Sequence, residues 1–163
     1  MKVTINVTRN DLLSDITGSD NTLFFSKLEE IFAQMLTEKK YLPDGVESVE
    51  VSLAVLTSAE MQDVNFEFRE LRESTDVLSF PLWEEDEKFT PPADWEPLPL
   101  GDIVICPAAI RANAESAGKT FAAELALVIL HGFLHLIGWD HDTQEKEDAM
   151  WAEQDRILSA GGF

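Results

Sequence analysis

Apolar residues alternate with polar ones in two segments of the chain, as they do along a half-buried β-strand. These segments are residues 3–7 and 49–55. Two shorter stretches rich in apolar residues, 76–80 and 101–106, are also typical of strands. The pattern therefore predicts four strands.

In other segments apolar residues recur at intervals of three and four, which is typical of amphipathic helices. The expected helices are residues 23–39, 57–69, 107–118, 120–137 and 143–159. Thr57 followed by Glu60 forms a capping box at the start of the second helix, and Asp142 is expected to cap the last. The order of elements predicts an α+β fold, in which about five helices cover a mixed sheet of about four strands.

Residues 82–100 interrupt this pattern. They contain four prolines, two tryptophans and six acidic residues against a single lysine. Because proline breaks both helices and central strands, we expect an extended acidic surface loop here.

Length and composition indicate one domain, residues 1–163, of ordinary globular character, with 45% hydrophobic and 26% charged residues. The alternating N-terminus predicts no signal peptide, and no apolar run is long enough to span a bilayer. The single cysteine, Cys106, forms no internal disulfide and suits a reducing compartment. We therefore expect a cytoplasmic protein without a membrane partner.

The net charge of −19 argues, taken alone, against a nucleic-acid partner, because a polyanion is repelled at long range. Net charge does not decide what a cleft binds, however. A bound dication and one or two arginines can dominate the local field.

All three histidines of the chain lie within the segment HGFLHLIGWDH, residues 131–141. His131 and His135 are four residues apart, so on a helix their imidazoles share one face. His141 would point elsewhere if the helix continued. Gly138 is the residue type that ends a helix with a left-handed turn, which lets His141 return to the same point.

Three neutral imidazoles favour zinc or another borderline divalent ion over magnesium and calcium. Three protein ligands also leave a fourth position for water, as catalytic zinc sites do. The sequence thus predicts a zincin-like metal-binding helix in a hydrolase. Three unrelated histidines would be the alternative, which their ligand spacing disfavours.

The spacing HxxxHxxGxxH is that of metzincin proteases, apart from the second position. Gly132 stands where such proteases carry a catalytic glutamate. Glycine cannot take a proton from metal-bound water, so a peptidase would need a base from elsewhere in the chain.

The histidine segment closely resembles HGxLHLxGxDH, the signature of the YbeY family of rRNA maturation endoribonucleases. Three further segments resemble that family: NFEFRELRESTDVLSF at 65–80, GDIVICP at 101–107, and the spacing of Met150 and Glu153. The resemblance covers roughly residues 50–158.

This resemblance implies a zinc-dependent endoribonuclease that is specific for single-stranded RNA and acts in 16S rRNA 3′-end maturation and ribosome quality control. It implies one Zn²⁺ per chain, held by His131, His135 and His141, with Arg69 and His131 as the catalytic residues. The implied partners are ribosomal RNA and the ribosome or small-subunit proteins.

Two other functions stay open: a zinc peptidase with a displaced base, and a non-catalytic ribosome assembly factor whose metal is structural. At the level of single residues, Arg69 could instead form a surface salt bridge at a helix end, as could Arg72. Asp140 and Asp142 could orient a histidine, or serve as turn and cap residues.

Overall fold

The structure is a computed structural model that describes residues 1–13, 21–71 and 74–163. The strands are β1 (Lys2–Thr8), β2 (Ser48–Val55), β3 (Val77–Pro81), β4 (Glu84–Glu85), β5 (Lys88–Phe89) and β6 (Leu98–Ile105). The helices are α1 (Asn21–Glu38), α2 (Ser58–Arg69), α3 (Pro107–Ala117), α4 (Phe121–Leu136) and α5 (Gln144–Gly161), with a short 3-10 helix, η1, at Asn10–Leu13.

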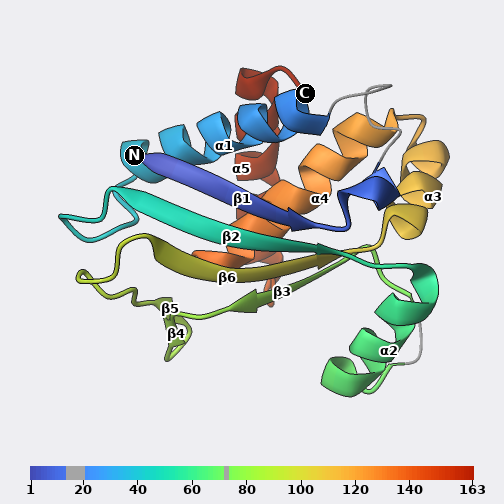
Figure 1. Ribbon diagram of the computed structural model, residues 1–163, viewed down its shortest axis with the longest axis horizontal. Helices are drawn as coiled ribbons and strands as arrows, with labels where there is room; N and C mark the ends of the chain where they lie inside the picture. The colour runs from blue at the N-terminus through green and yellow to red at the C-terminus, as the bar shows by residue number, and fades with distance from the viewer. Residues whose placement is uncertain (14–20, 72–73) are drawn as a thin grey trace.

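The main sheet has the strand order β1-β2-β6-β3. β1, β2 and β6 are parallel, and β3 pairs with β6 in the antiparallel direction. α1 packs on β1, α4 packs on β3 and β6, and α5 contacts both helices (Figure 1). The predicted α+β fold, a mixed four-stranded sheet with five helices, is confirmed.

The core lies between the sheet and the layer formed by α1, α4 and α5. The inward residues of β2, which include Val51 and Leu53, are almost completely buried, as the alternation predicts. Phe32 of α1 stacks on Phe133 of α4 with ring centroids 3.9 Å apart. This packing fixes α4, which is apolar on nearly every face, as the central helix.

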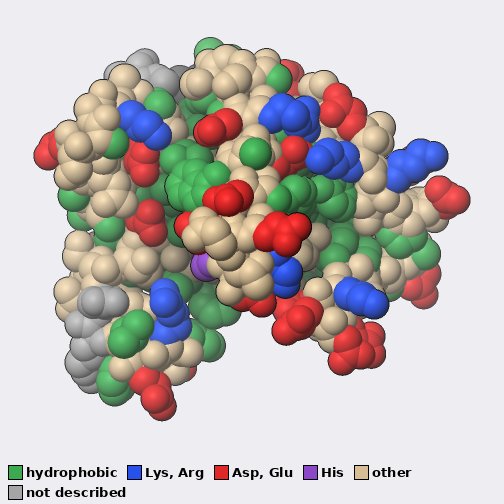
Figure 2. Space-filling view, turned by 180° about the vertical axis from the view of Figure 1, so that it is seen from behind, with side chains coloured by type: hydrophobic (Ala, Val, Ile, Leu, Met, Phe, Trp, Pro, Cys, Tyr) green, Lys and Arg blue, Asp and Glu red, His purple; other side chains and the backbone are tan. Residues whose placement is uncertain are grey.

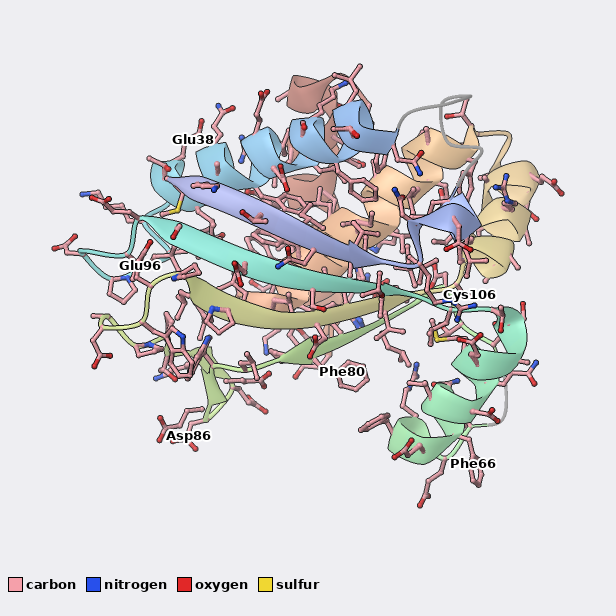
Figure 3. All side chains as sticks on the ribbon, viewed as in Figure 1. Glu38, Phe66, Phe80, Asp86, Glu96 and Cys106 are labelled. Carbon is pink, nitrogen blue, oxygen red and sulfur yellow. The ribbon has the colours of Figure 1, made fainter. Side chains whose placement is uncertain are left out.

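α2 lies apart from this helix layer, beyond the start of β3 (Figure 1). The Phe68 ring meets the Phe80 ring edge to face at 4.9 Å, and Phe80 points from β3 towards α2 (Figure 3). Met61 of α2 is fully buried against Leu78 and Val104. These contacts hold the C-terminal end of α2 beside the edge strand.

The expectation of a loop throughout residues 82–100 is wrong at two places. β4 and β5 form a small hairpin, and β6 begins at Leu98. Leu98 and Leu100 are fully buried, and that burial outweighs the break expected from Pro99. β3 pairs with β6 only as far as Gly101, so β3 requires no hydrogen bond from Pro99.

The last helix also differs from its prediction. Thr143, not Asp142, is the N-cap, and its hydroxyl accepts a hydrogen bond from the backbone N–H of Lys146. Asp142 pairs instead with the Lys146 ammonium at 3.0 Å. Met150 and Ile157 of this helix are buried in the core, whereas Trp151 is 47% exposed.

Among the described residues no helix is by itself long and apolar enough to cross a bilayer. α3 and α4 meet the length and composition criteria only as a pair, and they are bent by 117° relative to each other.

Candidate metal centre

α4 packs on the edge strand β3 and carries His131 and His135 near its C-terminal end. Thr120 caps its first turn, since the threonine hydroxyl accepts from the N–H of Ala123 at 3.1 Å. At its other end Gly138 has φ +97°, and the N–H of Trp139 donates to the carbonyl of Leu134 at 3.0 Å. The helix therefore stops in a left-handed turn at the predicted glycine.

The turn brings the third imidazole to the first two. The ligand atoms of His131, His135 and His141 all lie within 4.8 Å of one another. The Nε2 atoms of His131 and His135 are 3.1 Å apart. Ring centroids are separated by 4.6 Å for His131 and His135, 5.7 Å for His131 and His141, and 5.0 Å for His135 and His141.

Gln154 of α5 orients the first of these rings. Its side-chain oxygen lies 2.7 Å from Nδ1 of His131, and the glutamine is fully buried. An amide oxygen only accepts, so Nδ1 of His131 carries the proton and donates it. Nε2 of His131 is then the unprotonated nitrogen, and it faces the other two rings.

Burial keeps two of the imidazoles neutral. It lowers the pKa of His131 below its usual value, against the opposing effect of the hydrogen bond to Gln154. Burial, reinforced by the charges of His131 and His141, lowers the pKa of His135 to about 4. Both rings therefore offer free lone pairs at neutral pH, which a metal ligand requires.

Gly132 allows α4 to approach the sheet closely. A Cβ atom at this position would lie 2.9 Å from Cγ2 of Ile103 and 3.2 Å from the Ser79 hydroxyl oxygen. That hydroxyl donates to the Gly132 carbonyl at 3.3 Å. Position 132 thus faces the sheet, with no room for the glutamate that a metzincin protease carries there.

The three histidines lie in a cleft of about 770 Å³. Its walls are formed by α2, β3, the β4–β5 hairpin, the end of α4 and the start of α5. On the face shown in Figure 2, histidine is visible only inside a hollow of the surface. A metal at this point would have protein on one side and an open position towards the cleft.

Arg69 lies on the wall of this cleft, as the last residue of α2. Glu70 follows with φ 57°, so the helix ends there and leaves the arginine exposed at the rim. The structure therefore brings Arg69 to the same cavity as the three histidines. Arg72 lies outside the described residues.

The two aspartates considered as partners of the histidines have other roles. Asp140 accepts from the backbone N–H of His141 at 2.7 Å, and Asp142 pairs with Lys146. Gln154 takes the orienting role that sequence reasoning had considered for these two aspartates. Gln154 lies on the buried face of α5 between Met150 and Ile157. A polar residue at such a position needs a hydrogen-bond partner, and this could have indicated its role from the sequence.

The donor set fits a borderline divalent ion, because three imidazole rings bring their nitrogens to one point and one of the rings is fixed by a buried hydrogen bond.

Comparisons with known proteins found a matching family, curated relatives and a solved structure. Residues 15–162 match the family described as Endoribonuclease YbeY. A curated protein of that name from Bacillus velezensis is 37% identical, over 93% of this chain and 97% of its own length. Another from Staphylococcus epidermidis is 38% identical, over 92% and 94%. The solution structure of a Thermotoga maritima protein superimposes with a TM-score of 0.52 at 28% identity, covering 98% of this chain and 91% of that one.

Proposed function

The chain belongs to the Endoribonuclease YbeY family, and from that premise we propose that it is a zinc-dependent endoribonuclease that cuts single-stranded RNA. The observation that carries the proposal is the convergence of three imidazoles inside a cleft that also contains Arg69. A metal-dependent hydrolase needs such an open metal position beside a group that binds the scissile bond.

His131, His135 and His141 would hold the ion. When bound, zinc supplies Lewis acidity to a phosphoryl oxygen or to a water molecule. Gln154 holds the proton on Nδ1 of His131, which keeps Nε2 available as a ligand.

Arg69 is the proposed phosphate ligand. Its guanidinium can donate two parallel hydrogen bonds to a phosphodiester and stabilise the negative charge that develops in the transition state. Because Arg69 is exposed at the rim of the cleft, an entering strand reaches it without rearrangement of the core.

Gly132 distinguishes this reaction from peptide hydrolysis. The metzincin arrangement takes a proton onto a carboxylate at that position, and here the neighbouring Ile103 leaves no space for one. Phosphodiester cleavage depends more on positioning and on stabilisation of charge, which a metal ion and an arginine supply.

The biological setting follows from the family. The proposed substrate is ribosomal RNA, at the 3′ end of 16S rRNA, with a part in ribosome quality control and contacts to small-subunit proteins. The proposed compartment is the cytoplasm, where the buried thiol of Cys106 stays reduced. All of residues 1–163 would act as one catalytic domain.

The test is cleavage of three substrates by the zinc-loaded protein: single-stranded RNA, duplex RNA and unfolded casein, each with and without a chelator. The proposal expects cleavage of single-stranded RNA alone, abolished by the chelator and restored by zinc. Chelator-sensitive cleavage of casein without cleavage of RNA would show a peptidase instead. If no substrate is cut while the chelator unfolds the protein, the metal is structural and the protein is an assembly factor.

A further inference from the structure

Among the residues that the structure describes, the cleft carries little positive charge for an RNA-binding site. Arg69 and Lys146 are the basic residues of that described lining, and Glu84, Glu87 and Asp140 line the cleft as well. Lys146 is further neutralised by Asp142 at 3.0 Å. Apart from Arg69 and a bound dication, these residues and the net charge of −19 offer the phosphates of RNA little attraction.

Two aromatic residues on the same cleft wall offer another source of affinity. Tyr41 and Trp139 both line the cleft, and the indole N–H of Trp139 donates to the Tyr41 hydroxyl at 2.9 Å. Both are half-buried, so each keeps part of its surface open. The hydrogen bond satisfies the indole N–H, and the ring surface that is covered neither by the core nor by the Lys39 ammonium, 5.6 Å from the Trp139 ring centroid, is open to a ligand.

The position of this pair relative to the metal ligands is fixed by the backbone. Trp139 follows the glycine that ends α4 and precedes His141 by two residues, and its own N–H is bonded to Leu134. Tyr41 follows α1. The C-terminal ends of α1 and α4 lie at one end of the sheet and α2, which carries Arg69, at the other (Figure 1).

We propose that Tyr41 and Trp139 form a nucleobase subsite, in which one unpaired base of the RNA stacks while Arg69 binds a phosphate elsewhere in the cleft. This inference rests on the proposed function and gives a physical reason for the proposed selectivity for single-stranded RNA. Aromatic side chains stack on any base, but only on one that is free of its own helix. Base stacking, more than phosphate attraction, then supplies the affinity of this acidic protein for RNA.

Binding is measured by fluorescence anisotropy with the zinc-loaded protein and a 2′-O-methyl RNA decamer, which contains no free 2′-hydroxyl. Abasic sites are placed one at a time along the decamer. The protein variants are Trp139→Ala, Trp139→Phe and, as a matched control, Trp95→Ala. Trp95 is 53% exposed, contacts Trp83 and does not line the cleft.

The subsite predicts that an abasic site at one position weakens binding roughly tenfold or more, and that Trp139→Ala does the same while Trp95→Ala does not. Trp139→Phe keeps a ring and should lose less. The slope of log affinity against log salt should stay shallow, at about −1 to −2, which corresponds to one or two phosphate contacts.

Equal binding by every abasic decamer, or a salt slope of about −5 or steeper, would overturn the subsite. The abasic series uses the wild-type protein, so it decides the matter even if Trp139→Ala fails to fold. If the protein cuts natural RNA but abasic sites leave its binding affinity unchanged, the subsite is wrong and the proposed function stands. Failure of the wild-type protein to cut RNA removes the proposed function as well.

Discussion

At the scale of single residues, the site depends on a buried amide. Gln154 is fully buried, and its side-chain nitrogen has no hydrogen-bond partner among the described residues. An unsatisfied buried group costs free energy, so this glutamine is not explained by stability. Its role is at the metal centre, where the side-chain oxygen accepts a hydrogen bond from Nδ1 of His131.

Gln154→Leu should weaken zinc binding roughly 10- to 100-fold, because Nδ1 of His131 loses the acceptor that fixes its tautomer. The free energy of unfolding of the metal-free protein should hold or rise, since leucine removes an unsatisfied polar group. Competition with a chromophoric chelator measures the affinity, and Gln144→Leu, at the exposed start of α5, is the control. Unchanged zinc affinity together with a large loss of stability would assign Gln154 a structural role.

Arg69→Ala should lower the RNA cleavage rate about 10²- to 10³-fold while zinc content and melting temperature stay near wild type. The side chain is exposed, so its loss removes little packing. Arg69→Lys should rescue poorly, because an ammonium lacks the bidentate geometry. Arg9→Ala, at an exposed ion pair with Glu60 outside the cleft, is the control and should keep full activity. Equal loss in both variants would contradict the assignment.

At the scale of elements, the metal centre depends on where α4 stops. Periodicity and Gly138 sufficed to predict this helix and its end, because those signals are local. Sequence reasoning missed the start of β6 at Leu98, because pairing with β2 is a tertiary effect that overrides proline. It also missed Gln154, since contact between α4 and α5 follows no sequence spacing.

Gly138→Ala should destabilise the protein by about 1–2 kcal/mol and also weaken zinc binding, because the strained turn positions His141. A Cβ atom there would lie 3.0 Å from Cβ of Phe89. Gly118→Ala is the matched control: that glycine also has a left-handed φ, +65°, but nothing lies within 4 Å of its added Cβ. Both variants should lose stability in urea titrations, and only Gly138→Ala should lose metal affinity. An equal metal affinity in the two would show that the turn does not position the ligand.

At the scale of the whole molecule, the fold is set by the hydrophobic pattern and not by the net charge. The hydrophobic pattern predicted the sheet and its helices, whereas the net charge of −19 neither specified nor prevented that fold. The acidity has a cost, because like charges repel one another in the compact state. In the proposed nucleobase subsite, stacking on the bases takes over part of the affinity that a basic protein would gain from the phosphates.

Raising NaCl from about 0.02 to about 0.3 M should therefore increase the free energy of unfolding, since added salt screens the repulsion among 31 acidic residues. Urea titrations at each salt concentration measure the effect, because urea itself is uncharged. A stability that falls with salt would mean that attractive pairs, such as Lys39 with Glu153, outweigh the repulsion.

The central claim is that three imidazoles hold one divalent ion and leave a coordination position open to the cleft. X-ray absorption at the zinc edge of the loaded protein tests this most directly. The account predicts three imidazole nitrogens and one exchangeable oxygen around a single ion per chain. A fourth protein ligand that closes the shell, or a zinc ion bound away from His131, His135 and His141, would contradict it.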